Sequence, residues 1–152
     1  MIINDEDKIQ LAFNELNNGL NFTIEQGFND EILKRAVYQN IITIEEYNAT
    51  MKNYTKVVSL RAYNDIKQGL GLPDVTFSRL KKGVKLGFIS EEQEKEAITS
   101  YHIIQAKRAY NNLMKGIDFG FNFERLDKGV ELGVISFEEK EQATSTYKSI
   151  TK

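Results

Sequence analysis

Residues 80–92 read Leu80-Lys81-Lys82-Gly83-Val84-Lys85-Leu86-Gly87-Phe88-Ile89-Ser90-Glu91-Glu92, and a closely similar stretch covers residues 126–138. A more diverged copy covers residues 33–45, and repeated positions along the chain lie 46–50 residues apart. Gly87 is followed by an apolar residue, which is typical of a helix that ends in the left-handed conformation. The other copies have Gly133 and Asn40 there, and asparagine also tolerates that conformation. Each copy therefore predicts the end of a helix.

A second helix is predicted to begin directly after this end. A hydroxyl residue is followed three positions later by Glu or Gln, which is the pattern of a capping box. In a capping box the hydroxyl and the longer side chain each accept a hydrogen bond from a backbone N–H of the first turn. The boxes pair Ser90 with Gln93, Ser136 with Glu139 and Thr43 with Glu46, and Asn4 is expected to cap the first helix.

This corner resembles the helix-turn-helix corner of small bacterial SHOCT-type modules, which are often associated with oligomerisation. The resemblance covers residues 80–97 and 126–143. It implies a helical corner, and it assigns no functional residue to this chain.

A second motif recurs in step with the corner. Arg61-Ala62-Tyr63-Asn64 returns as Arg108-Ala109-Tyr110-Asn111 and, more weakly, as Leu11-Ala12-Phe13-Asn14. Each motif is followed by a glycine that we expect to end its helix. These glycines are Gly69, Gly116 and Gly19.

The pattern as a whole predicts an all-α fold of about seven helices in three imperfect short–long repeats. Apolar residues recur every three or four positions in the long helices, and no segment is predicted as a strand. The sequence leaves open whether the repeats form a compact bundle or a short α-solenoid. We expect one domain, residues 1–152, with repeats at 4–42, 43–89 and 90–135 and a truncated last helix at 136–152. Helices are expected at 4–18, 25–39, 43–68, 75–86, 90–115, 122–132 and 136–150.

The composition excludes several classes of site. The chain has 152 residues, no Cys, one His and a formal net charge of −2. Disulfides, thiolate nucleophiles and cysteine or multi-histidine metal sites are therefore excluded. No nucleophile or acid is visibly arranged around His102, so we interpret it as a surface or edge residue. Because the sequence also contains no phosphate loop or cofactor motif, we expect no enzyme, no cofactor and no metal.

A short basic run is the first candidate for a partner contact. Arg79, Lys81, Lys82 and Lys85 lie on the helix predicted at 75–86. They form either a solvated face or an electrostatic docking surface. The matching helix of the last repeat carries mixed charges, whereas a nucleic-acid groove built from repeats would be expected to repeat its cations.

Two aromatic residues break the repeat pattern and are the other candidates. Phe137 follows a predicted N-cap, and Phe121 lies in the preceding loop. They either cover the truncated C-terminal end of the fold or anchor a partner.

Other repeated residues have structural interpretations. We interpret the small-residue pairs Gly83/Gly87 and Gly129/Gly133 as close helix crossings with a C-cap, rather than as a dimer face. Asparagines of the second motif are expected to bond backbone groups, and equivalent tyrosines to pack in the core with their hydroxyls at its edge. These residues are Asn14, Asn64 and Asn111, and Tyr54, Tyr101 and Tyr147.

The expected function is that of a non-catalytic protein-binding module, because helical repeats supply extended binding surfaces. The alternative is a self-assembling structural component, so a homo-oligomer stays open. The 16 Ile, 15 Lys and 13 Asn residues indicate an AT-rich genome, which favours a bacterial or phage inhibitor or an immunity-like protein. Balanced charge argues against nucleic acid as a partner. The absence of a long apolar run and the acidic residues at 5–7 argue against a membrane and a signal peptide, so we expect a cytoplasmic protein.

Overall fold

The computed structural model describes residues 4–152, and the first three residues of the expected domain lie outside this range. The fold is all-α, as predicted, with seven helices in the described range. Six of them begin and end within two residues of the predicted positions. The helices are α1 (Asp5–Asn17), α2 (Asn29–Tyr38), α3 (Ile44–Lys67), α4 (Pro73–Lys85), α5 (Glu91–Met114), α6 (Asn122–Glu131) and α7 (Phe137–Ile150).

The prediction for the segment before α2 was wrong. A helix was expected from residue 25, but the chain forms an antiparallel hairpin of β1 (Phe22–Thr23) and β2 (Gly27–Phe28) before α2 begins. Gly27 has a φ of +79°, which suits the turn, and the Asn29 N–H donates to the Asn21 carbonyl at 2.6 Å. Strands of two residues are too short to show an alternating pattern, so the sequence analysis had no signal for them.

Helices begin and end at the predicted capping residues. The Glu139 N–H donates to Ser136 Oγ at 3.0 Å and the Ser136 N–H donates to Glu139 Oε1 at 3.0 Å, which confirms that capping box. Thr43 and Glu46 form the same reciprocal pair. Asn4 caps α1 by accepting from the Asp7 N–H at 2.8 Å. Positive φ angles mark the helix-ending residues Gly19, Gly69, Gly116, Gly87, Gly133 and Asn40.

The described chain divides into two compact units. The first unit comprises residues 4–62 and 78–90, and the second comprises residues 63–77 and 91–152. In the first unit, α1 packs against α2 around the buried residues Ala12, Leu16 and Leu33. Tyr47, Met51 and Tyr54 of α3 pack against the same cluster.

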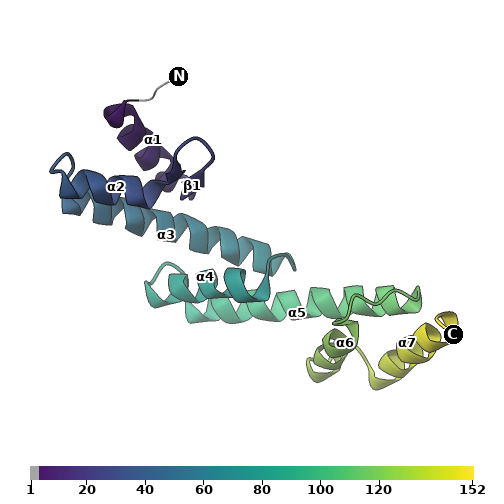
Figure 1. The fold of residues 1–152 in the computed structure, drawn as a ribbon. Helices are drawn as coiled ribbons and strands as arrows, with labels where there is room; N and C mark the ends of the chain where they lie inside the picture. The colour runs from purple at the N-terminus through teal and green to yellow at the C-terminus, as the bar shows by residue number, and fades with distance from the viewer. Residues whose placement is uncertain (1–3) are drawn as a thin grey trace. The chain divides into compact units, whose positions relative to one another are not determined.

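The core of the second unit is built on α5. Both α6 and α7 pack against α5 (Figure 1). Ala106, Ala109 and Leu113 of α5 form a buried cluster with Leu126 of α6 and Ala143 of α7. Tyr147 also packs on this cluster, and its ring meets that of Phe123 edge-on with centroids 5.6 Å apart.

Two glycines allow a short helix to cross a long helix closely. A Cβ atom on Gly83 of α4 would lie 2.5 Å from Ser59 Cβ of α3, inside the first unit. A Cβ atom on Gly129 of α6 would lie 2.7 Å from Ala106 Cβ of α5, inside the second unit. These contacts confirm the interpretation of the small-residue pairs as close crossings, because only glycine fits at either position.

Candidate functional site

Exposed apolar residues gather in the loops that lead from a long helix to the next short helix. Each loop carries one directly after the helix-ending glycine, one two positions later, and one directly before Asn29, Thr76 or Asn122. Their side chains are 38% to 72% exposed, although loops of this kind usually present polar residues. We call these nine the loop apolar residues: Leu20, Phe22 and Phe28; Leu70, Leu72 and Val75; Ile117, Phe119 and Phe121.

Buried asparagines hold the first and third loops by hydrogen bonds to the loop backbone. Asn29 and Asn122 begin α2 and α6 and are fully buried. Asn29 Nδ2 donates to the Leu20 carbonyl at 3.1 Å, and Asn122 Nδ2 donates to the Ile117 carbonyl at 3.1 Å. In the second loop, Thr76 Oγ1 takes the corresponding position and accepts from the Leu72 N–H.

Arginines of the following long helix hold the first two loops from the side. Arg61 Nη2 donates to the Asn18 carbonyl at 3.0 Å, and Arg108 Nη1 donates to the Gly69 carbonyl at 3.2 Å. Gln105 Nε2 donates to the Gly69 carbonyl as well, at 2.7 Å. These bonds satisfy carbonyls at a helix end, so the loops keep a defined conformation while their apolar side chains stay in solvent.

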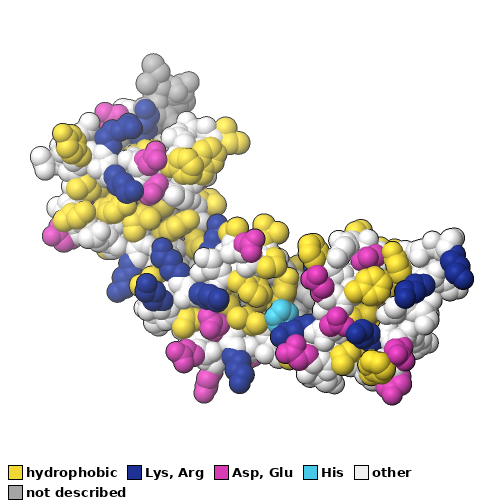
Figure 2. Space-filling view, turned by 60° about the horizontal axis from the view of Figure 1, so that its bottom comes forward, with side chains coloured by type: hydrophobic (Ala, Val, Ile, Leu, Met, Phe, Trp, Pro, Cys, Tyr) yellow, Lys and Arg dark blue, Asp and Glu magenta, His cyan; other side chains and the backbone are white. Residues whose placement is uncertain are grey.

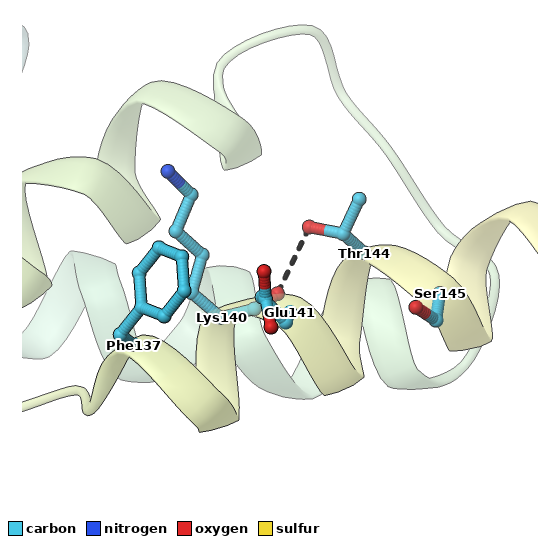
Figure 3. A pocket seen from close by; sticks show the side chains of 5 residues that line it. All are labelled: Phe137, Lys140, Glu141, Thr144 and Ser145. Atoms are coloured by element: carbon cyan, nitrogen blue, oxygen red, sulfur yellow. Dashed lines mark hydrogen bonds between the residues drawn. The ribbon is translucent and has the colours of Figure 1, made fainter.

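Of the two aromatic residues predicted either to cover the C-terminal end or to anchor a partner, Phe121 is one of the loop apolar residues and is 59% exposed. Phe137 is 57% exposed and lies at the start of α7. It lines a hollow of about 450 Å³, which is drawn in Figure 3. Both side chains are therefore more than half exposed to solvent.

The hollow beside Phe137 is a helix face rather than a cleft between elements. Its lining residues all come from α7, and Figure 3 shows them following one another along that helix. The Lys140 ammonium forms an ion pair with Asp127 of α6, and Thr144 Oγ1 donates to the Lys140 carbonyl at 2.9 Å. The polar groups of Lys140 and Thr144 therefore already have partners inside the protein.

Two residues of the predicted basic run, Arg79 and Lys82, line a second hollow. In the first unit, a hollow of about 200 Å³ lies between α3 and α4, lined by Tyr54, Thr55, Val58, Arg79 and Lys82. Figure 2 shows Lys and Arg side chains beside hydrophobic ones in the left centre of the view, over the region that α3 and α4 occupy. Within residues 4–152, the ion pairs involve none of the four predicted cations, Arg79, Lys81, Lys82 and Lys85.

A comparable hollow, of about 190 Å³, lies between α1 and α2. Counting from the buried leucines Leu33 and Leu80, its Arg35 corresponds to Lys82 of the hollow between α3 and α4. Lys128 of α6 has the same position relative to Leu126. A comparison of total charge between whole helices does not reveal this recurring cation, because the residues around it differ in sign from one helix to the next.

His102 lies on α5 and is partly buried, near the charged groups of α6. Its imidazole meets the Tyr101 ring edge-on, with the centroids 5.5 Å apart. Burial, and then the Lys128 ammonium, lower the pKa of His102 below its ordinary value, while the Glu131 carboxylate opposes the shift. The imidazole is therefore harder to protonate than that of a fully exposed histidine.

The described residues also bear on metal sites and membrane-spanning helices. Within residues 4–152, no group of three or more His, Asp or Glu side chains comes together in a way that could hold a metal ion. No helix in the described range combines the length and apolarity needed to span a bilayer.

Comparison with known proteins gives no family assignment. No family model, no curated protein and no solved structure matches the chain.

Proposed function

We propose that the chain is a non-catalytic protein-binding module. The observation that carries this proposal is the set of loop apolar residues, which recurs at equivalent positions in all three loops. Contiguous apolar surface on a folded protein is typical of interaction sites, and aromatic residues are enriched among the anchors of protein interfaces.

The way in which the loops are held supports this proposal. An anchor contributes more to affinity when it is ordered before binding, because less conformational entropy is lost in the complex. Asn29, Asn122, Arg61 and Arg108 fix the loop backbones. In the first loop the Phe22 and Phe28 rings also pack edge-on, with centroids 5.1 Å apart.

The finer proposal is a bacterial or phage inhibitor, or an immunity-like protein, that covers a target in the cytoplasm. It is supported by the abundance of residues with A/T-rich codons, 16 Ile, 15 Lys and 13 Asn. Such a protein would act by covering a surface of its target, so it would require no catalytic residues of its own.

Affinity capture tests the proposal. The tagged chain is incubated with nuclease-treated lysate of an AT-rich bacterium, and bound proteins are identified by mass spectrometry. We expect one stoichiometric protein with the wild type, and its loss with the double variant Phe119→Asp/Phe121→Asp. The control variant is Tyr38→Asp, because Tyr38 is 88% exposed but lies outside the loops. Capture of nothing by the wild type, or of the same protein by the loop variant, would contradict the proposal.

A self-assembling component is the second candidate, favoured by the exposed Phe137 ring at the start of α7. It predicts an oligomer whose size grows with concentration in sedimentation velocity. Phe121→Asp or Phe137→Asp should then return the protein to its smallest species. A wild type that sediments as one species at every concentration would exclude this candidate.

A further inference from the structure

We propose that the hollow between α3 and α4 binds an acidic segment of a partner protein. An apolar side chain of that segment fills the hollow, and carboxylates next to it in the sequence bind Arg79 and Lys82. This inference rests on the proposed binding function and adds the chemistry of the partner at one defined place.

The inner wall of the hollow is mostly apolar and lies against the core of the first unit. Tyr54 and Val58 lie one turn apart on α3, and Val58 is only 9% exposed. Tyr54 packs on the buried cluster formed by α1 and α2. A hollow of about 200 Å³ is smaller than the sites that hold drug-sized ligands, so it suits a single apolar side chain.

The rim of the hollow is positively charged. Arg79 and Lys82 both come from α4 and both are exposed. Arg79 can bind a carboxylate through two parallel hydrogen bonds, and Lys82 adds a point charge one turn away. In the described part of the chain neither forms an ion pair, so no internal carboxylate competes with a ligand for them.

The corresponding positions elsewhere favour a protein segment over a nucleic acid. In the hollow between α1 and α2, Ile32 replaces Arg79, and the acidic Asp5 lies among the lining residues together with the cations Lys8 and Arg35. On α6, Lys128 already pairs with Glu131 at 3.4 Å. A nucleic-acid backbone requires a continuous track of cations. Arg79 and Lys82 instead lie beside a single apolar hollow, in a chain of net charge −2.

Fluorescence anisotropy with labelled nine-residue peptides tests the inference. The probe has a central Phe flanked by Glu residues, and the comparison peptide has Ser in place of the Phe. We expect the Phe peptide to bind at least about tenfold more tightly than the Ser peptide, because burial of the ring adds to the charge attraction. Binding of the Phe peptide should weaken on addition of salt.

Variants of the rim complete the test. The double variant Arg79→Glu/Lys82→Glu should weaken binding at least about tenfold, whereas the control Lys81→Glu, on the same helix but outside the lining, should weaken it less than about threefold. Arg79→Gln/Lys82→Gln serves as a second variant in case the reversed charges disturb folding, which circular dichroism will show. Both variants should keep the wild-type helical content.

Four results would overturn the inference. The first two are that the Phe peptide does not bind at about 1 mM, and that the Phe and Ser peptides bind with equal affinity. The third is that the rim variants and the Lys81 variant lose the same amount of affinity for the Phe peptide. The fourth is that a single-stranded DNA of equal charge binds more tightly than the Phe peptide. If the rim variants still capture the partner that the loop variant loses, the proposed function stands and only this inference fails.

Discussion

Asn29 and Asn122 show how the same buried residue can be satisfied to different degrees. Both amides donate to a loop carbonyl, but only Asn29 also accepts, from Gln26 Nε2 at 3.0 Å. Asn122 Oδ1 is buried and has no protein partner in the described chain. An unsatisfied buried acceptor reduces the stability that the residue contributes, unless water reaches it.

We therefore expect Asn29→Ala to destabilise the protein more than Asn122→Ala. Loss of the Asn29 bonds should cost about 1–3 kcal/mol, while the Asn122 variant also removes an unsatisfied group and should cost less. Thermal unfolding midpoints of the two variants, measured side by side, check the order. Equal midpoints would indicate that water satisfies Asn122 Oδ1.

At Gly83 the limiting factor is space. Gly83→Ala should destabilise the protein by about 1–3 kcal/mol, because the new methyl group would overlap Ser59 Cβ. Ser59→Gly removes that atom, so the double variant should be less destabilised than the sum of the single variants. Urea unfolding of all four proteins in the cycle measures the coupling. Additive effects would exclude the close crossing.

The pKa of His102 makes part of the stability depend on pH. Its folded-state pKa lies below the unfolded value of 6.5, so the unfolded chain binds the proton more readily. The contribution of neutral His102 is complete above that value and is lost as the pH falls through the lower folded-state pKa. Comparison of wild type with His102→Gln between about pH 8 and pH 5 should show a smaller loss of stability in the variant. Parallel curves would contradict this.

At the scale of helices, the ends of a helix can be predicted wherever the residues that cap it lie close together in the sequence. Capping boxes and helix-ending glycines act within four residues, so they set the limits of six helices closely. The hairpin of β1 and β2 depends on the contact between Asn21 and Asn29 across the loop, and no local pattern marks it.

The candidate site was less predictable than the helices, for a related reason. The sequence repeats singled out three asparagines, Asn14, Asn64 and Asn111, but all three are exposed in the structure. The asparagines whose side chains bond the loops are Asn29 and Asn122, which are buried. The equivalent position in the second loop is occupied by Thr76, so a comparison of residue types does not show that the three positions correspond. The correspondence emerges only when positions are counted from the buried leucines Leu33, Leu80 and Leu126.

Removal of an arginine side chain should increase hydrogen exchange only in the loop that this arginine bonds. Arg61→Ala removes two bonds to the carbonyls of Asn18 and Gly19, so amides of residues 19–28 should exchange faster with solvent. Arg108→Ala should have this effect on residues 69–75 instead. Hydrogen exchange by mass spectrometry distinguishes the two patterns, and each variant is the control for the other. A uniform increase in both would mean that the arginines stabilise the fold as a whole.

For the molecule as a whole, the loop apolar residues predict a native surface that binds apolar dyes. The folded protein should increase the fluorescence of anilinonaphthalene sulfonate at neutral pH, as exposed apolar clusters do. Leu70→Asp/Leu72→Asp and Phe119→Asp/Phe121→Asp should each lower the signal, with Tyr38→Asp as the control. Unchanged fluorescence in both loop variants would show that the dye binds elsewhere.

The bonds from Arg61 and Arg108 also have a consequence for the length of the chain. Each arginine reaches back to the loop of the preceding long helix, and the two occupy the same place in their repeats. Excision of residues 62–108 would join Arg61 to Ala109, restore the Arg-Ala-Tyr-Asn sequence and bring Gly129 opposite Ser59, as Gly83 is now. The one new glycine crossing in the shortened chain, Gly129 against Ser59, would have the same kind of partner that Gly83 has now. We therefore expect that a whole repeat can be removed in one step, and that circular dichroism of the shortened chain would still show a helical protein.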